Sequence, residues 1–298
     1  MISAHDYDKN YHFEINGASY IAKPVSNTVL FVGKKLGTLL GNLDTVQNCL
    51  VFVETGTVFP QELKKEHCLI ETDDPARAYG EVARQLHEKR SLADRTRKYR
   101  LTEEGYTIGE NVSLGKNILI EPGVVIGHDV SIGDNSVILS GAKIKNSIIG
   151  KNCVVKENAI VGSWSFSMYK DQNGNYMRTY SLGRAILKDY VEVGAITTVC
   201  RGMGGDTVLG EHTKTDDHVH IGHDVQCGKN VTLVAGTILG GFCILEDNVY
   251  IGLNATLRNR ITIGENTLIG MGSVVTKSIP ANQVVMGNPA KRKEEAGK

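Results

Sequence analysis

Residues 208–252 read VLGEHTKTDDHVHIGHDVQCGKNVTLVAGTILGGFCILEDNVYIG, and an apolar or small residue returns at every sixth position of this stretch. The series comprises Leu209, Thr215, Ile221, Cys227, Leu233, Leu239, Leu245 and Ile251, and it continues through Leu257, Ile263, Ile269 and Val275. A matching upstream series comprises Ile108, Leu114, Ile120, Ile126, Ile132, Ile138 and Ile144. Only Thr215 and Cys227 depart from the aliphatic rule. A chain with 41% hydrophobic residues does not produce this agreement by chance.

A second inward series follows the first by four residues. Its members are Val112, Ile118, Val124, Val130 and Ser136, then Thr213, Val219, Val225, Val231, Thr237 and Cys243. Two inward positions in six residues are typical of a short strand followed by a corner. Glycine often comes next, as in Ile221-Gly222 and Ile251-Gly252, because a tight corner has little room for a Cβ atom. Three such edges close one triangular coil, and about eight coils stacked at roughly 4.8 Å form a parallel β-helix. The alternative, consecutive α/β units, requires helix-period segments that this region lacks.

The register slips mark insertions at the corners. A long excursion over 163–186 contains Trp164, the only tryptophan, and several tyrosines. A step of ten residues between Val199 and Leu209 adds a smaller Gly-rich corner. Loops on a rigid scaffold commonly carry binding groups, so we expect part of the site there.

The first hundred residues lack the repeat and predict a small α/β domain. The runs NTVLFV (27–32) and NCLVFVE (48–54) resemble buried strands, and DDPARAYGEVARQLHEKR (73–90) resembles a helix. Asp74 is the expected N-cap and Pro75 suits the first helical position; Ala76, Tyr79, Val82, Ala83 and Leu86 form the expected apolar face. We therefore predict a mainly β protein with a small α/β domain at 1–88, a linker at 89–104, the β-helix at 105–280 and a tail at 281–298.

Composition limits the function classes. Lys plus Arg and Asp plus Glu number 33 each, so no global charge directs the chain to nucleic acid or an anionic membrane. The six cysteines form no CxxC pair and the start of the chain has no basic-then-apolar leader, which predicts a cytoplasmic location. No run of about twenty apolar residues exists, which predicts the absence of a membrane span.

Four histidines within EHTKTDDHVHIGHDV form the densest titratable cluster; they are His212, His218, His220 and His223. A neutral imidazole at His223, just after a corner, is a candidate general base for an attacking amine, oriented by Asp216, Asp217 or Asp224. The strand pattern predicts that His218 and His220 share an outward side. Two other interpretations stay open. The histidines bind zinc, although no further thiolate or carboxylate completes a known site, or they only decorate the surface. We expect no metal.

The segment VEVGAITTVCRGMGGDTVLGEHTKTDDHVHIGHDVQCG (191–228) resembles the signature region of UDP-3-O-acylglucosamine N-acyltransferases. IVGSWSFSMY (160–169) and LIETDDPARAYGEVARQL (69–86) extend the resemblance to nearly the whole chain. The resemblance implies a left-handed β-helix, a nucleotide-binding-like domain at 1–88, a catalytic base at His223 and an acidic partner at Asp216. It also implies substrate-binding residues at Phe31, Trp164, Phe166, Tyr169 and His220. We also expect a homotrimer, because a prism whose outer faces carry loops and histidines forms good sites only where a neighbour's face closes them.

The chain departs from that family at several positions. Trp164-Ser165 stands where the family has Asp-Gly, Cys200 replaces an aspartate, Arg260 replaces a histidine, and Phe31 lacks an aromatic partner. The family's C-terminal helical extension has no counterpart. The ending VVTKSIPANQVVMGNPAKRKEEAGK (274–298) instead resembles CoA-dependent sugar acetyltransferases, which implies donor-binding residues at Lys277, Gly287, Asn288, Pro289 and Ala290. Pro289 also suits a plain end of the β-helix.

The sequence thus leads to a first functional hypothesis, transfer of an acyl group from acyl-CoA to the amine of a nucleotide-linked amino sugar, with no permanently bound cofactor. The second is the lipid A reaction itself, with a hydroxyacyl chain delivered by acyl carrier protein as a partner. A non-catalytic β-helix scaffold and a zinc hydrolase or carbonic anhydrase are the remaining alternatives.

Overall fold

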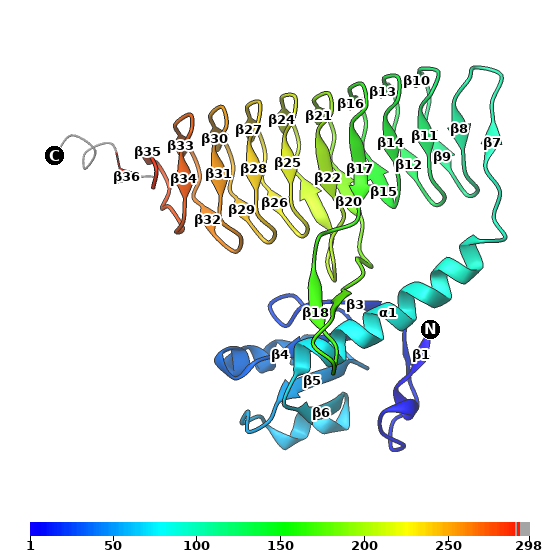
Figure 1. The fold of residues 1–298 in the computed structure, drawn as a ribbon, viewed down its shortest axis with the longest axis vertical. Coiled ribbons are helices and arrows are strands. Elements are labelled where there is room, and N and C mark those ends of the chain that lie inside the picture. Colours follow the sequence, from blue (N-terminus) through cyan, green and yellow to red (C-terminus); the bar gives the residue numbers. More distant parts are fainter. Residues whose placement is uncertain (290, 293–298) are drawn as a thin grey trace. The chain divides into compact units, whose positions relative to one another are not determined.

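The computed structural model describes residues 1–289 and 291–292, which form two compact units (Figure 1). The N-terminal unit comprises Met1–Thr96, Phe166–Gly183 and Met203–Gly205. The prism unit comprises Arg97–Ser165, Arg184–Gly202 and the residues from Asp206 onward. Each unit has its own buried apolar core.

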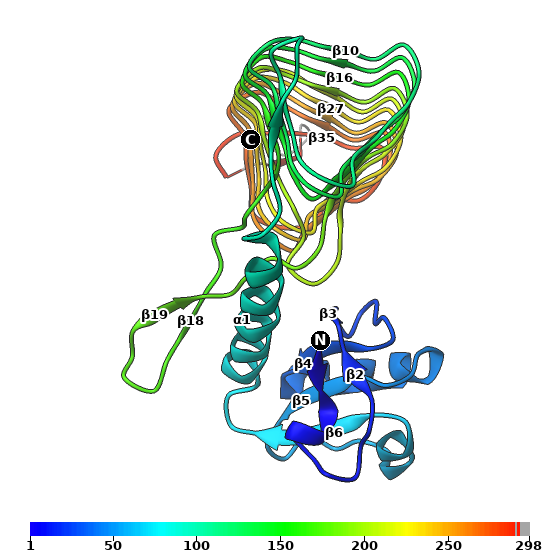
Figure 2. The same cartoon turned by 90° about the vertical axis from the view of Figure 1, so that its right-hand side faces the viewer.

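The prism unit is a left-handed parallel β-helix with three flat faces, which Figure 2 shows nearly end-on. The first face contains β7 (Arg100–Leu101), β8 (Thr107–Ile108), β11 (Val125–Ile126), β14 (Lys143–Ile144), β17 (Ile160–Ser163), β22 (Thr198–Cys200), β25 (His220–Ile221), β28 (Ile238–Leu239), β31 (Thr256–Leu257) and β34 (Val274–Val275). The second contains β9 (Ser113–Leu114), β12 (Ser131–Ile132), β15 (Ser147–Ile149), β20 (Ala185–Leu187), β23 (Thr207–Leu209), β26 (Gln226–Cys227), β29 (Ile244–Leu245) and β32 (Thr262–Ile263). The third contains β10 (Leu119–Ile120), β13 (Val137–Ile138), β16 (Val154–Val155), β21 (Glu192–Val193), β24 (Lys214–Thr215), β27 (Thr232–Leu233), β30 (Tyr250–Ile251), β33 (Leu268–Ile269), β35 (Val284–Met286) and β36 (Lys291–Arg292).

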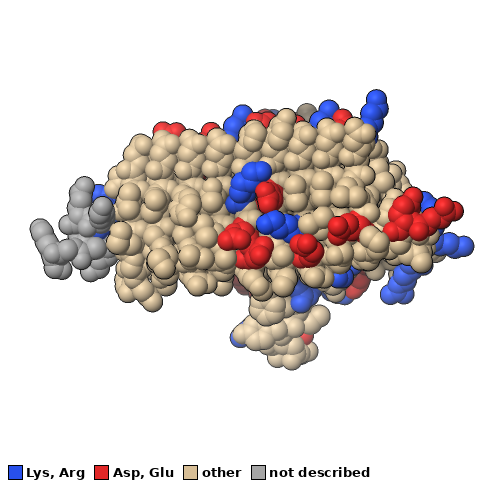
Figure 3. Space-filling model, turned by 90° about the horizontal axis from the view of Figure 1, so that it is seen from above, with Lys and Arg blue, Asp and Glu red and all other residues tan. Residues whose placement is uncertain are grey.

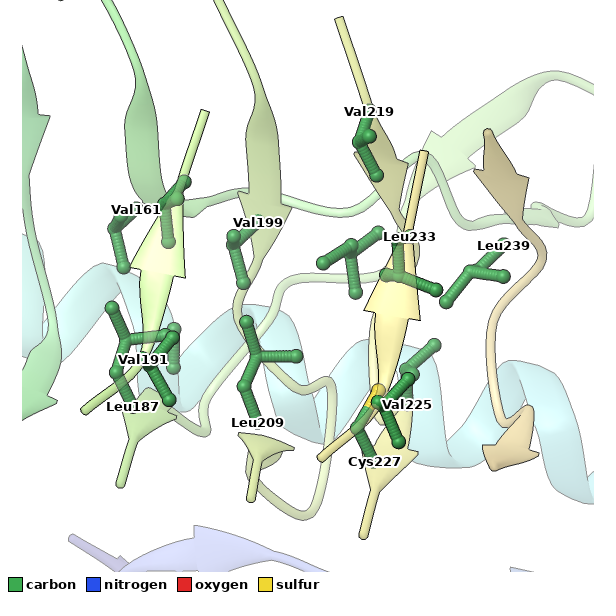
Figure 4. Close-up of a cluster of buried hydrophobic side chains, with 14 of the residues drawn as sticks. Val161, Leu187, Val191, Val199, Leu209, Val219, Val225, Cys227, Leu233 and Leu239 are labelled. Carbon is green, nitrogen blue, oxygen red and sulfur yellow. The ribbon is translucent and has the colours of Figure 1, made fainter. Parts of the chain in front are cut away.

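The period-six residues form the core of this unit, as predicted, except Leu114 near its N-terminal end, which is 37% exposed. Each strand pairs in parallel with the equivalent strand of the next coil, for example Ile126 with Ile144. Figure 4 shows their side chains inside the coils. The two exceptions to the aliphatic rule, Thr215 and Cys227, are buried as well. Burial of this stacked apolar series is the main stabilising term of the prism unit.

The corners depend on two kinds of residue. At Gly222 a Cβ atom would approach the backbone nitrogen of Gly241 to 2.7 Å, so the glycine is required by the next coil. Two residues further on, the backbone adopts positive φ, which asparagine tolerates. At the corner between the second and third faces these side chains form amide ladders with spacings of 3.0–3.3 Å; the ladders are Asn117–Asn135–Asn152 and Asn230–Asn248–Asn266–Asn282.

Both ends of the prism have a short antiparallel strand. At the first coil β7 pairs with β8 in the segment predicted as a linker, and Arg97 beside it pairs with Asp129 and Glu110. At the last coil β36 pairs with β35. Each of these strands covers one open sheet edge, of the first face at one end and of the third face at the other, where backbone groups would otherwise be unpaired.

The N-terminal unit contains a four-stranded parallel sheet covered by one helix. It includes the two strands and the helix that the sequence predicts. Its elements are β1 (Ile2–Ser3), η1 (Ala4–Asp6), β2 (Glu14–Ile15), β3 (Gly17–Ala18), β4 (Thr28–Val32), η2 (Lys34–Thr45), β5 (Leu50–Glu54), η3 (Gln61–Lys65), β6 (Cys68–Thr72) and α1 (Pro75–Asp94), with sheet order β3-β4-β5-β6. Asp74 caps α1 by accepting from the backbone of Arg77, and Tyr79, Val82, Ala83 and Leu86 are buried while Ala76 is exposed. The helix continues beyond residue 88, since no glycine or proline interrupts it.

Most of the predicted loop 163–186 belongs to the N-terminal unit. It forms the hairpin β18 (Met168–Lys170) and β19 (Tyr176–Arg178). The Tyr169 ring packs on Gly80 of α1, where a Cβ atom would lie 2.6 Å from the ring. The Tyr20 hydroxyl accepts from the backbone N–H groups of Gly204 and Gly205, so the second insertion is fixed to the same unit. Among the described residues, no helix is long and apolar enough to cross a membrane.

Because inward and outward side chains alternate, two neighbouring substitutions in β29 should have unequal effects on the stability of the protein. Leu245→Ala should destabilise the protein by about 2–5 kcal/mol, because Leu245 is buried and its removal leaves a cavity. Ile244→Ala, on the outward side, should cost under about 1 kcal/mol because Ile244 is already 45% exposed. Urea denaturation midpoints measure both. Equal shifts would contradict the assigned inward and outward sides.

Candidate functional site

One corner of the prism carries the candidate base. We call it the histidine corner and define it by the turns between first-face and second-face strands at 222–224, 240–242, 258–260 and 276–278. The Phe242 backbone nitrogen donates to the carbonyl of His223, and that of Arg260 donates to the carbonyl of Gly241. Side chains of these turns therefore stack at the coil spacing of about 4.8 Å.

His223 is held by its sequence neighbour. Its Nδ1 lies 2.8 Å from Oδ2 of Asp224, whose side chain is almost completely buried. The Asp224 backbone nitrogen donates to the Thr207 hydroxyl of the previous coil, which holds the backbone of this turn in place. Because an ionised carboxylate only accepts, Nδ1 carries the proton and the Nε2 lone pair is available.

The next coil shapes the space around Nε2. A methyl group at Gly241 would lie 2.6 Å from Nε2, so only glycine leaves room for the imidazole. The Phe242 ring meets the imidazole edge-on, with centroids 5.0 Å apart. The Arg260 guanidinium carbon lies 4.3 Å from the centre of the same phenyl ring. Imidazole, phenyl and guanidinium thus form one stack along the corner.

This environment keeps the imidazole neutral. Burial lowers the pKa of His223 from 6.5 to about 4, and the positive charges of Arg260 and His220 act in the same direction. Burial also lowers the pKa of His220, which lies on β25 one strand position before the corner. The Asp224 carboxylate opposes these effects. At neutral pH His223 is therefore a hydrogen-bonded, unprotonated base.

The prediction that Asp216 faces the imidazole is wrong. The Asp216 carboxylate accepts from the backbone nitrogens of Asp217 and Ala235, at a different corner. Asp224 takes the partner position because the turn directs its side chain back to the ring of the preceding residue.

The four histidines do not form one cluster. His212 and His218 occupy positive-φ corner positions, so His218 does not share a strand with His220 as predicted. The His212 ring stacks on Tyr190 at 4.6 Å. The structure brings together only His220 and His223 of the four. Within the described part of the chain no group of three His, Cys, Asp or Glu side chains is arranged to hold a metal ion.

The expected substrate-binding aromatics have different surroundings. Phe31 is half-buried and packs against Tyr79 with centroids 5.1 Å apart, inside the N-terminal unit. Tyr169 is a packing residue of the hairpin. Trp164, in the prism unit, is 49% exposed, and Phe166, in the N-terminal unit, is 85% exposed. The last two side chains have the surface needed to contact a ligand.

The expected donor-binding residues separate into two places. Lys277 is exposed and lies at the histidine corner, in the position that His223 occupies three coils earlier. Gly287, Asn288 and Pro289 are exposed at the other end of β34, where the Gly287 carbonyl accepts from the Val274 nitrogen. Ala290 lies outside the described residues.

Sequence reasoning did not assign Gly241 and Phe242 to the site. Both lie 18 positions after His223 and Asp224, at the equivalent corner positions of the next coil. A search of the repeat at this interval would have found them. Arg260 follows Phe242 at the same interval, although it was noted only as a departure from the family.

The comparisons with known proteins support the fold and part of the resemblance. The model of the bacterial transferase hexapeptide (six repeats) matches 111–146 and 242–277, and that of the hexapeptide repeat of succinyl-transferase matches 218–252. The chain is similar to solved UDP-N-acetylglucosamine acyltransferases from Campylobacter jejuni (24% identity, TM-score 0.57, 65% of this chain and 74% of that one) and Francisella novicida (22%, 0.58, 65% and 69%). At these identities the likeness concerns the fold.

The curated relatives are UDP-3-O-acylglucosamine N-acyltransferases. The protein from Agrobacterium fabrum is 40% identical over 96 residues, and that from Rhizobium meliloti is 38% identical over 96 residues. Each match covers 32% of this chain and 27% of the relative. The resemblance to this family is therefore confirmed over about a third of this chain, and the chain spans about a quarter of the length of the relatives that it matches.

The charge arrangement predicts how His223 titrates. Its pKa should lie well below 6.5, and Arg260→Asn should raise it, because removing a cation makes the imidazolium less unfavourable. Asparagine tolerates the positive φ of this corner, so the backbone should persist. Nuclear magnetic resonance of labelled histidine, assigned with His223→Ala, measures the midpoint. Arg258→Asn on the same coil is the control and should change it less. Identical midpoints in wild type and Arg260→Asn would show that the guanidinium does not act on the imidazole.

Proposed function

We propose that this protein is an acyltransferase that acylates the amine of a nucleotide-linked amino sugar. The observation that carries the proposal is the pair His223–Asp224, in which a buried carboxylate fixes the imidazole with Nε2 free and neutral. The similarity to curated N-acyltransferases over about a third of the chain supports the same chemistry.

In the proposed reaction the acceptor amine attacks the thioester carbonyl of the donor. The C–N bond forms, and Nε2 of His223 takes a proton from the nitrogen, which becomes positively charged during the attack. The C–S bond then breaks, the protonated imidazole returns that proton to the leaving thiolate, and the free thiol departs. Asp224 stabilises the transient imidazolium through the Nδ1–H bond. Gly241 keeps the space at Nε2 open for the amine.

For the donor we propose acyl-CoA. Exposed cations at the histidine corner, Arg258 and Lys277, suit the phosphates of a compact nucleotide at the end of a thin arm. The second candidate donor is an acylated acidic carrier protein. The names of the curated relatives favour this donor, because the sequence analysis connected that family with the lipid A reaction. A carrier protein requires a broad basic surface.

We further propose a homotrimer in which the N-terminal unit binds the nucleotide. Exposed Tyr250, Leu268 and Val284 pair in register on the third face, and an apolar row of this kind suits burial against a second copy. Figure 3, which views that side, shows charged side chains of both signs gathered over the middle and N-terminal coils and mostly uncharged surface over the C-terminal coils. The parallel sheet of the N-terminal unit is an architecture whose strand ends commonly hold nucleotides.

The catalytic assignment predicts graded losses of turnover. His223→Ala should lower kcat by about 10²–10⁴ with little change in acceptor KM, because it removes proton transfer rather than binding. Asp224→Asn should cost on the order of 10², since the amide no longer fixes the tautomer or the charge. Asp216→Asn is the matched control and should stay near wild type. A screen of acetyl-CoA and longer acyl-CoA donors against UDP- and dTDP-amino sugars supplies the assay. Unimpaired turnover in His223→Ala would refute the proposed base.

The donor assignment predicts saturable binding of CoA. Lys277→Ala should weaken it about tenfold, the effect expected for one charge-assisted hydrogen bond. Lys229→Ala is the control, because Lys229 pairs with Glu211 at another corner. Isothermal calorimetry measures all three proteins. Absence of CoA binding together with transfer from acyl carrier protein would reverse the choice of donor.

A further inference from the structure

The C-terminal part of the histidine corner carries only positive charge. Arg258 and Arg260 lie in the turn two coils after His223, and Lys277 lies in the following turn. All three side chains are exposed, and within residues 1–289 none of them forms an ion pair. The turns 240–242, 258–260 and 276–278 contain no acidic residue. This differs from the ion-paired cations elsewhere on the prism, such as Lys156 and Lys214, which share Glu192.

Arg260 is the cation that the structure holds near the base. Its guanidinium carbon lies 4.3 Å from the centre of the Phe242 ring, which is perpendicular to the His223 imidazole at a centroid distance of 5.0 Å. A guanidinium packed on a phenyl ring is restricted in position. Its N–H groups lie in the guanidinium plane and can still donate hydrogen bonds to a ligand. Arg260 thus presents the paired N–H donors of its guanidinium to a ligand, with only the Phe242 ring between it and the His223 imidazole.

This position has an electrostatic cost for the proposed reaction. The groups that act on the His223 ring are Asp224 on Nδ1, the Arg260 guanidinium and the His220 imidazole, which disfavours protonation of His223 when it is itself protonated. When the imidazole takes a proton, it becomes a cation beside Arg260. An anionic ligand group on Arg260 would offset that repulsion, and by linkage its binding and protonation of the base favour each other.

We propose that Arg260 is an anion subsite for the acceptor, which binds a carboxylate or phosphate group of the amino-sugar substrate beside the reacting amine. The inference rests on the proposed function, because it takes His223 as the base. It narrows the substrate class to amino sugars with an anionic group close to the amine. Arginine suits this role because its planar fork pairs with carboxylate or phosphate through two parallel hydrogen bonds.

The positions of Arg260 and Lys277 relative to His223 indicate that the anion bound by Arg260 belongs to the acceptor rather than to the donor. Arg260 reaches back over Phe242 to the coil next to the base. The phosphates of acyl-CoA are separated from the thioester by the pantetheine arm, so they suit Lys277, which stands three coils, or about 14 Å, from His223. The two cations therefore serve different ends of the substrate pair.

The first experiment tests the subsite without catalysis. Inorganic phosphate should raise the pKa of His223 in the wild-type protein, measured by histidine resonances, and should have no such effect in Arg260→Asn. Sodium chloride at equal ionic strength corrects for screening, and Lys229→Ala, at another corner, should behave as wild type. Equal shifts in wild type and Arg260→Asn, or no shift in either, would overturn the subsite. This result does not depend on whether the protein is an acyltransferase.

The second experiment identifies the anion by steady-state kinetics. It compares a nucleotide amino hexose with the corresponding nucleotide amino hexuronate, which adds a carboxylate to the sugar. Arg260→Asn should lower kcat/KM at least tenfold, selectively for the hexuronate if the carboxylate binds and equally for both if the diphosphate binds. Arg260→Lys should restore part of the loss. A rise confined to the KM of acyl-CoA would overturn the assignment to the acceptor. Loss of all transfer in the wild type would instead refute the proposed function.

Discussion

The hydrogen-bond ladder between successive coils is the constraint on which the rest of the prism unit depends. Each strand residue pairs with the residue at the same position of the next coil, as Ile108 does with Ile126 and Ile126 with Ile144. Buried backbone groups that lost these partners would be costly, so extra residues are accommodated at corners. Because the coils are in register, side chains at equivalent corner positions must stack. The functional stack at the histidine corner is a direct consequence.

Most of the fold could be predicted from the sequence, because the two inward positions of each six-residue repeat determine the strand, the corner and the register between coils. It also indicated the N-cap of α1 and the residue His223. It did not distinguish Asp224 from Asp216. That choice depends on the hydrogen bond from Asp224 to Thr207, and Thr207 follows an insertion whose phase the repeat cannot define. Likewise, His218 lies at a corner with positive φ, a backbone conformation that the alternating strand pattern does not reveal, so the pattern assigned it to the wrong position.

Both insertions leave the prism at the histidine corner. The chain between β17 and β20 and that between β22 and β23 pass from the first face to the second, as the turn with His223 does one coil later. Residues 166–183 and 203–205 contribute to the N-terminal unit, where Tyr20 and Gly80 hold them. The corner that carries the base is thus also the one through which the chain connects twice to the other unit. If the N-terminal unit binds the nucleotide, as proposed, these two connections link it covalently to the histidine corner, where the amino sugar would react.

The balance of charge around His223 suits an amine acceptor in particular. A neutral amine needs no base to attack, but once the C–N bond forms, its nitrogen is a much stronger acid than a free ammonium ion. A weak base is then sufficient to take the proton, and a base whose pKa lies below the working pH is almost entirely in the competent form. A hydroxyl acceptor has the opposite requirement, because its proton must be removed during attack and a stronger base accelerates that step. The buried environment and the cation of Arg260 therefore favour N-acylation over O-acylation at this corner, while Asp224 limits how far basicity falls.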